Sequence, residues 1–319
     1  VRGCFAGGVF TELGKEDSMK TRALRLYGEN DLRLEEFQLP EMQQDEMLVK
    51  IMTDSVCMST YKLSKQGAKH KRTPDTLDPP VIVGHEMCGV IKQVGEKWQG
   101  KYHVGQKFTI QPALLHEGRQ KNPGYFYPYY GGDCTYCIIP NEAIEGGCVI
   151  PFNGSSFFEA SLFEPVACII AGYKRMYHTS DETHAHEMGV KKGGKIVIFG
   201  ACGPMGLECI DYALQLQPAA EMVVAVDIST ERLARAEDML RPRADGANLI
   251  FFNGNDSTDP VRDLLELSGG TGFDDAFVYA PVAPLIEQAD KVLGSDGCMN
   301  FFAGPVDKQL TAGINMYNV

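Results

Sequence analysis

Residues 196–206 read IVIFGACGPMG, an apolar run followed by a turn that contains three glycines. The run predicts a buried strand, and LECIDYALQL directly after the turn has the apolar spacing of a helix. In such a strand-turn-helix unit, backbone N–H groups and the helix N-terminus can approach a pyrophosphate. The residues that we expect to contact a dinucleotide here are Gly200, Gly203, Pro204, Met205 and Gly206.

The same rhythm of strand and helix continues to the end of the chain. The apolar runs MVVAVDI, NLIFFN, DAFVYAP and CMNFFAG alternate with the helical patterns TERLARAEDML, DPVRDLLEL and PLIEQADKVL. This alternation is typical of βαβ units with a parallel sheet. Residues 176–319 are therefore predicted to form an α/β domain with a doubly wound parallel sheet.

Asp227 ends the second of these runs, about 20 residues after the glycine turn. A carboxylate at this place can accept hydrogen bonds from the adenosine ribose hydroxyls, and it would repel a 2′-phosphate. We therefore expect NAD(H) in preference to NADP(H), with Arg232 as a further cofactor contact. The alternative is a tight turn followed by a surface aspartate.

Residues 19–175 follow a different pattern. Short alternating or β-branched runs, such as MLVKIMTD, VIVGHEMCGVI and KFTIQPAL, are divided by Gly and Pro, which predicts a mainly β domain. Residues 1–18 lack periodicity and are interpreted as a leader or a non-native extension.

The β-rich domain contains side chains that zinc accepts as ligands. Cys57 lies in DSVCMSTYK, Glu164 lies in FEPVAC, and His85 and Glu86 lie inside the strand-like run at residues 81–91. Three protein ligands (Cys57, His85 and Glu164) would leave a fourth position for water or substrate. Glu86 could orient the ligands or replace one of them transiently. Each side chain also has a structural alternative: a buried thiol, a backbone-bonded pair or a carboxylate at a helix start.

The order Cys57, Gly84-His85-Glu86, Glu164-Pro165, glycine turn and Asp227 resembles the zinc-dependent medium-chain alcohol and polyol dehydrogenases. The resemblance covers Met19 to Val319. It implies a GroES-like catalytic domain followed by a Rossmann domain, with one catalytic zinc per chain. It also implies hydride transfer between NAD(H) and a ketose phosphate or polyol phosphate, with Ser59 as the hydroxyl that faces the substrate.

The sequence departs from this family in three regions. Thr60 and Lys62 stand where the family often has an aspartate and a histidine, which leaves the proton relay to solvent open. The family often has a lobe of four closely spaced cysteines that bind a structural zinc, whereas residues 112–132 contain no cysteine, and Cys134 and Cys137 align with a strand rather than with that lobe. Two thiols do not complete a four-ligand site, so no structural zinc is expected. The family also returns from the second domain to complete the first, and the sequence ends at Val319, so we interpret it as short at its C-terminal end.

A basic run follows Cys57 in a chain that is otherwise acidic, with 30 Lys and Arg against 42 Asp and Glu and a net charge of −12. Such a run is often a solvated face, but next to metal ligands it can bind a substrate phosphate. The candidate phosphate ligands are Lys62, Lys69, Lys71 and Arg72. A second polar stretch, YHTSDETHAHE at residues 177–187, contains three histidines, and we expect a surface loop there rather than a second metal site.

The net charge argues against nucleic acid and anionic membrane surfaces as partners. Ten cysteines lack the spacing of a disulfide scaffold, and in a reducing compartment we expect them to be thiols or metal ligands. We therefore expect a cytoplasmic homodimer or homotetramer that acts on a small-molecule sugar phosphate or polyol. The alternatives are a polyol or threonine-like dehydrogenase with an unphosphorylated substrate, and a catalytically inactive NAD-binding fragment.

Overall fold

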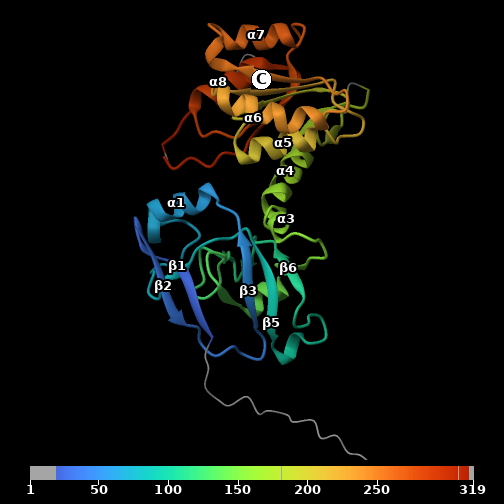
Figure 1. Cartoon of the computed structure of the whole chain (residues 1–319). Coiled ribbons are helices and arrows are strands. Elements are labelled where there is room, and N and C mark those ends of the chain that lie inside the picture. Colours follow the sequence, from blue (N-terminus) through green and yellow to red (C-terminus); the bar gives the residue numbers. More distant parts are fainter. Residues whose placement is uncertain (1–18, 181, 308, 316–319) are drawn as a thin grey trace, which may run out of the picture. The chain divides into compact units, whose positions relative to one another are not determined.

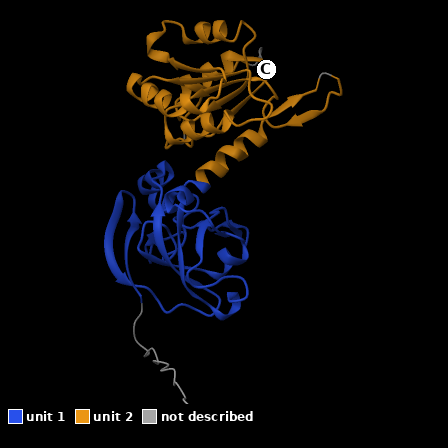
Figure 2. Cartoon of the chain, turned by 45° about the vertical axis from the view of Figure 1, so that its right-hand side comes forward, with its two compact units in different colours: residues 1–163 blue, residues 164–319 orange. Residues whose placement is uncertain are grey.

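The computed structural model describes residues 19–180, 182–307 and 309–315 (Figure 1). The leader predicted for residues 1–18 lies outside the described residues. The chain divides into two compact units, residues 1–163 and 164–319 (Figure 2). The domain boundary predicted near residue 175 lies one helix later than this division, because contacts assign residues from Glu164 onward to the second unit. None of the described helices combines the length and the apolarity that a membrane-spanning segment requires.

The first unit is rich in β-strands, as the sequence predicts. Its strands are β1 (Lys20–Gly28), β2 (Asp31–Gln38), β3 (Met47–Asp54), β4 (Val81–Ile82), β5 (Met87–Val94), β6 (Lys107–Ile110), β7 (Leu115–His116), β8 (Arg119–Gln120), β9 (Tyr136–Ile139) and β10 (Val149–Pro151). Its helices are α1 (Met58–Gln66), α2 (Asn141–Glu145) and α3 (Phe157–Ser161).

Two antiparallel sheets form the frame of this unit. One has the strand order β10-β6-β5-β3-β9 and the other the order β2-β1-β4. Side chains that alternate along the strands, including Met47, Val49 and Ile51 of β3, point into one buried cluster with Ile91 and Phe108. This core fixes the ends of β3 and β5, from which the candidate ligands project.

The apolar run at residues 81–91 does not form one strand. Strand β4 ends at Ile82 and β5 begins at Met87, so His85 and Glu86 lie in the loop between two sheets. Gly84 has a φ of 92°, and a Cβ at this position would lie 2.6 Å from the backbone nitrogen of Asp133. The chain therefore turns where only glycine fits. The prediction that His85 and Glu86 lie inside a strand is wrong for this reason.

The second unit contains the predicted parallel sheet, with the strand order β15-β14-β13-β16-β17. Its strands are β11 (Tyr177–Thr179), β12 (His186–Met188), β13 (Lys195–Phe199), β14 (Met222–Asp227), β15 (Leu249–Asn253), β16 (Phe273–Val278) and β17 (Leu293–Phe301). Its helices are α4 (Phe163–Arg175), α5 (Pro204–Ala213), α6 (Thr230–Leu240), α7 (Pro260–Leu267) and α8 (Ala283–Val292).

Helices cover both faces of this sheet. Ile196 and Ile198 of β13 pack with residues of α4, α5 and α6, whereas Val197 and Phe199 pack with residues of α7 and α8. A strand buried on both faces explains why its sequence is an unbroken apolar run. The α/β class and the doubly wound sheet predicted from sequence are confirmed.

The polar stretch at residues 177–187 differs from its prediction. Strands β11 and β12 pair antiparallel as a hairpin, and His178 is buried in it. His178 Nε2 lies 3.1 Å from Oδ1 of Asp275 on β16, and Nδ1 lies 3.0 Å from the carbonyl oxygen of Asp296. The surface loop is therefore wrong for this histidine, because a polar side chain can be buried when distant residues supply its partners. His184 and His186 are exposed.

Candidate active site

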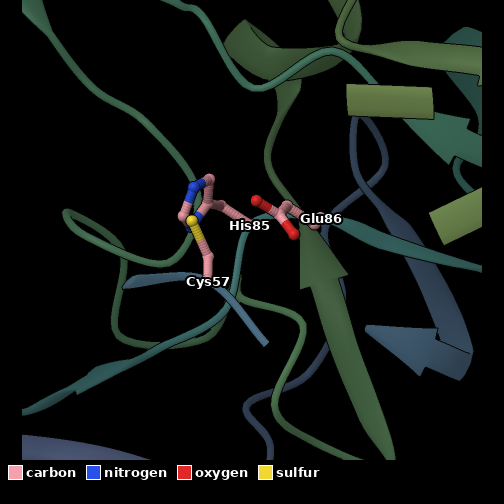
Figure 3. Close-up of side chains that lie close together, drawn as sticks. All are labelled: Cys57, His85 and Glu86. Atoms are coloured by element: carbon pink, nitrogen blue, oxygen red, sulfur yellow. The ribbon is translucent and has the colours of Figure 1, made fainter. Parts of the chain in front are cut away.

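Cys57, His85 and Glu86 converge in the first unit (Figure 3). Cys57 precedes α1 as its N-cap in an extended conformation, and its side chain makes no capping hydrogen bond. His85 and Glu86 come from the loop before β5. One potential ligand atom from each of the three side chains lies within 4.8 Å of the others. This spacing suits donors that surround a single cation.

Ser59 lies between two of these side chains. Its Oγ is 2.8 Å from Cys57 Sγ and 3.2 Å from His85 Nε2. Because Ser59 lies in the first turn of α1, the helix start places it next to Cys57. The structure thus brings together Cys57, Ser59, His85 and Glu86, four of the residues selected from sequence. Their catalytic roles stay predictions.

The electrostatics of this group suit a metal cation. Burial, together with the positive charge of Arg72, lowers the pKa of His85 to about 4, so the imidazole is neutral at neutral pH. Neutral imidazole is the form that ligates metals. Within the described residues, His85 Nδ1 is buried and has no hydrogen-bond partner. Burial, reinforced by Glu86, raises the pKa of Cys57 to about 12, and only a bound cation would stabilise its thiolate. The donor set and the unpartnered nitrogen fit zinc.

Glu86 is held from two sides. The Ser55 hydroxyl donates a hydrogen bond to Glu86 Oε2, and the Glu86 N–H donates to Asp54 Oδ1 at 2.8 Å. Burial is the largest of the effects that raise the pKa of Asp54 well above its usual range. These bonds orient the Glu86 carboxylate toward the Cys57 and His85 side chains, where it could support or replace a ligand.

Glu164, the third ligand predicted from sequence, belongs to the second unit. It lies in the first turn of α4, where Cys168 Sγ is 3.6 Å from its Oε1. Its participation in the metal site stays a prediction.

The glycine turn has the geometry of a phosphate-binding loop. Gly200 follows β13 with a φ of 70°, and Gly203 is the N-cap of α5. Pro204 and Met205 start that helix. A Cβ at Gly206 would lie 2.5 Å from the carbonyl oxygen of Ala201, so the helix packs too closely on the turn for another residue.

Asp227 connects this turn to the end of β14. Its Oδ2 accepts a hydrogen bond from the Cys202 N–H at 3.1 Å, and its Oδ1 accepts from Ile228 and Ser229 at 2.8 and 3.3 Å. The carboxylate is therefore a structural anchor as well as a candidate ribose ligand. The sequence alone indicated only the second role.

Arg232 lies at the start of α6, where its N–H donates a hydrogen bond to the Ser229 hydroxyl that caps the helix. Burial raises the pKa of Cys202 to about 12, while the positive charges of Arg235 and Arg232 oppose this increase. Both arginines therefore act electrostatically on the glycine turn. Arg235 was not selected from sequence, since nothing in the helical pattern distinguishes it.

The residues of the basic run after Cys57 have different surroundings in the structure. Lys69 forms an ion pair with Glu29 at 2.9 Å, and Lys71 is exposed. Lys62 is partly buried within α1. The guanidinium carbon of Arg72, in contrast, lies 5.3 Å from the ring centroid of Tyr125. Since the charge of Arg72 also lowers the pKa of His85, Arg72 is the member of the run that acts on the candidate metal site.

Tyr125 was missed in the sequence. Its ring centroid lies 5.0 Å from that of His85, and the residue is completely buried. The only local signal was an aromatic cluster, GYFYPYY at residues 124–130, which is also typical of a core.

Cys134 and Cys137 lie just before β9 and within it. Cys137 is buried in β9, and the Cys134 thiol donates to the carbonyl oxygen of Gly131 at 3.2 Å. Burial raises the pKa of Cys134 well above its usual range. Cys137 is therefore a core residue, and Cys134 is partly buried against the same core.

Residues 43–148 match the family described as the alcohol dehydrogenase GroES-like domain. Mannitol-1-phosphate 5-dehydrogenase of Aliivibrio fischeri is 45% identical over 305 residues, which cover 94% of this chain and 72% of that protein. L-Sorbose 1-phosphate reductase of Klebsiella pneumoniae is 44% identical over 300 residues, again covering 94% and 72%.

The crystal structure of galactitol-1-phosphate dehydrogenase from Escherichia coli has the same fold, with a TM-score of 0.69 at 21% identity over 93% of this chain and 78% of that chain. The identities to the two curated relatives extend over both units, and the matched family domain contains Cys57, Ser59, His85 and Glu86. The chain belongs to the zinc-dependent medium-chain alcohol and polyol dehydrogenase family.

Proposed function

We propose that this protein is a zinc-dependent, NAD(H)-linked reductase that converts L-sorbose 1-phosphate to glucitol 6-phosphate. The observation that carries the proposal is the group of Cys57, Ser59, His85 and Glu86 with the positive charge of Arg72 beside it. A site for zinc and a site for an anion thus adjoin each other in the first unit.

Cys57 and His85 would hold zinc, with Glu164 as a third ligand and Glu86 as a supporting or alternate one. The glycine turn and Asp227 would hold NAD(H). When bound, zinc supplies Lewis-acid polarisation of a carbonyl oxygen and the nicotinamide supplies hydride.

The chain's own residues would hold the reacting groups and manage the proton. Ser59 keeps a hydroxyl within hydrogen-bond distance of Cys57 Sγ and His85 Nε2, so this hydroxyl can reach an oxygen held at the same place. It would pass a proton to that oxygen as the carbonyl becomes an alcohol and would regain one from water. His85 and Glu86 are themselves buried, which strengthens electrostatic interactions at their side chains.

The two curated relatives act on sugar phosphates that differ in geometry. In L-sorbose 1-phosphate the phosphate sits on the carbon next to the carbonyl, whereas the name of the mannitol-1-phosphate 5-dehydrogenase places its reaction at carbon 5, far from the phosphate. Arg72 lies one aromatic ring away from His85. This short separation favours a phosphate adjacent to the reacting carbon, and therefore L-sorbose 1-phosphate.

NAD(H) is favoured over NADP(H) because the Asp227 carboxylate would repel a 2′-phosphate. The positive charges of Arg232 and Arg235 would oppose this repulsion. The preference for NAD(H) therefore depends on the position of the Asp227 carboxylate at the end of β14. The cytoplasmic location and the homodimer or homotetramer predicted from sequence stay predictions.

The test is a substrate panel with zinc-replete protein and NADH, in which NADH oxidation is followed with L-sorbose 1-phosphate, D-fructose 6-phosphate and unphosphorylated L-sorbose. We expect L-sorbose 1-phosphate to have the highest kcat/KM. A preference for D-fructose 6-phosphate would favour the mannitol-1-phosphate type of reaction. A preference for the free sugar would favour an unphosphorylated polyol, and no turnover with any partner would support an inactive dinucleotide-binding chain.

A further inference from the structure

Tyr125 occupies the centre of a stack of side chains next to the candidate metal ligands. Its ring lies 5.3 Å from the His70 ring, to which it is nearly parallel, and 5.0 Å from the His85 ring. The Arg72 guanidinium lies 5.3 Å from the same ring centroid. Tyr125 is therefore a rigid wall between His85 and the positively charged Arg72.

The hydroxyl of Tyr125 is unusual for a buried group. No hydrogen bond to it reaches normal geometry among the residues that the structure describes, but Ser59 and Arg72 lie within interaction range of it. Burial raises the pKa of Tyr125, while Ser59 and Arg72 act in the opposite direction and the Cys57 thiol adds to the increase. The hydroxyl thus faces Cys57, Ser59 and Arg72. Such a weakly satisfied hydroxyl can still donate a full hydrogen bond to a group that enters beside Ser59 and Arg72.

We propose that Tyr125 is a specificity-determining residue, whose hydroxyl donates a hydrogen bond to a phosphate oxygen of the substrate beside Arg72. This inference rests on the proposed sugar phosphate substrate. Ser59 already serves the reacting oxygen, because it alone contacts both Cys57 Sγ and His85 Nε2 within the described residues. Tyr125 then contacts the next group along the substrate.

The chemistry of that next group is set by Arg72. A guanidinium favours an anion with several acceptor oxygens, and a phosphate ester offers three. Gln120 Oε1 accepts a hydrogen bond from Arg72 Nε at 3.3 Å, which restrains the plane of the guanidinium. A neutral hydroxyl donor beside it adds a charge-assisted hydrogen bond to the same anion without adding charge.

Tyr125→Phe removes the hydroxyl and keeps the ring that packs against His70 and His85. Tyr130→Phe is the matched control, since Tyr130 is also buried and its hydroxyl lacks a partner among the described residues. The Tyr130 ring packs in the core of the first unit, 5.7 Å from that of Tyr127. The two variants therefore differ in whether the deleted hydroxyl faces the site.

Calorimetry with the zinc-loaded protein and NADH would measure the Kd of D-glucitol 6-phosphate and of unphosphorylated D-glucitol. We expect Tyr125→Phe to weaken binding of the phosphate ester at least about tenfold and to change D-glucitol binding less than about threefold. Tyr130→Phe should change neither, and the Tm of each variant shows that it is folded before its binding is compared.

Unchanged binding of D-glucitol 6-phosphate to Tyr125→Phe would overturn the role of Tyr125. An equal loss for both ligands would also overturn it, because the hydroxyl would then not read the phosphate. Wild-type protein that binds D-glucitol 6-phosphate no more tightly than D-glucitol would overturn the proposed substrate itself, and this result is read before any variant is compared.

Discussion

The His178 pair offers a prediction that depends on no bound group. The His178 side chain is 8% exposed and the Asp275 side chain is completely buried, with Nε2 and Oδ1 3.1 Å apart. His178→Leu keeps an apolar body of similar size and removes the donor. In this variant the buried Asp275 carboxylate loses its His178 partner.

The loss in the free energy of unfolding depends on the hydrogen-bond partners that Asp275 keeps. Breaking a buried ion pair by removing one partner costs about 3 to 5 kcal/mol when the other charge is left uncompensated. Asp275 Oδ2 still accepts a hydrogen bond from the Lys191 N–H at 2.9 Å. We therefore expect the lower end, about 3 kcal/mol of the free energy of unfolding.

The pH dependence has a definite sign. The hydrogen bond with Asp275 is the largest cause that raises the pKa of His178, against the opposing effect of burial. A raised pKa in the folded state gives a stabilisation that is complete below the usual histidine pKa of about 6.5. This contribution is lost as the pH rises through the folded-state pKa. The stability difference between wild type and His178→Leu should thus be larger at about pH 6 than at about pH 9.

Denaturant unfolding followed by circular dichroism at both pH values measures these differences. His186→Leu is the control, because His186 is exposed on the same hairpin. The control should stay within about 0.5 kcal/mol of wild type. A loss below about 1 kcal/mol for His178→Leu, or a difference that grows with pH, would refute the reasoning.

Three further predictions concern the site. Cys57→Ser should remove the bound zinc, since a hydroxyl is a poorer zinc ligand than a thiolate, whereas Cys134→Ser should keep about one zinc per chain by elemental analysis. Two tightly bound zinc ions per wild-type chain would contradict the single catalytic site. Asp227→Ala should weaken NADH binding more than NADPH binding in fluorescence titrations, and an unchanged ratio would show that Asp227 is not the selector. Arg72→Ala should raise the KM for L-sorbose 1-phosphate at least about tenfold. Lys69→Ala should raise it less than about twofold, because Lys69 is paired with Glu29. Equal effects of the two variants would contradict the role of Arg72 in phosphate binding.

The parallel sheet was predictable because its signals are local. β13 and β14 are buried on both faces, so their sequences are apolar apart from Lys195 and Asp227 at their ends. The helices between the strands carry their own spacing. The glycine turn was equally visible, since Gly206 is required by the close approach of the turn to α5. The order of residue types along the chain then indicated Cys57 and His85.

The features that were missed depend on contacts between distant residues. The strand-like run at residues 81–91 is broken because Gly84 turns against Asp133, which the run itself does not reveal. His178 is buried because Asp275 and Asp296 supply its partners, about 100 residues later in a βα fold. Tyr125 became a candidate only when its ring was found beside His85. Sequence periodicity reports which face is apolar, and it does not report which polar groups meet.

The most direct test of the proposed chemistry is the kcat/KM for L-sorbose 1-phosphate relative to L-sorbose, measured by NADH oxidation before and after zinc removal by a chelator. We predict at least about a tenfold preference for the phosphate ester in the zinc-replete protein, from one or more charge-assisted hydrogen bonds at Arg72. We also predict loss of activity on chelation and recovery on addition of zinc. Equal or greater efficiency with free L-sorbose, or full activity after zinc removal, would contradict the proposed chemistry.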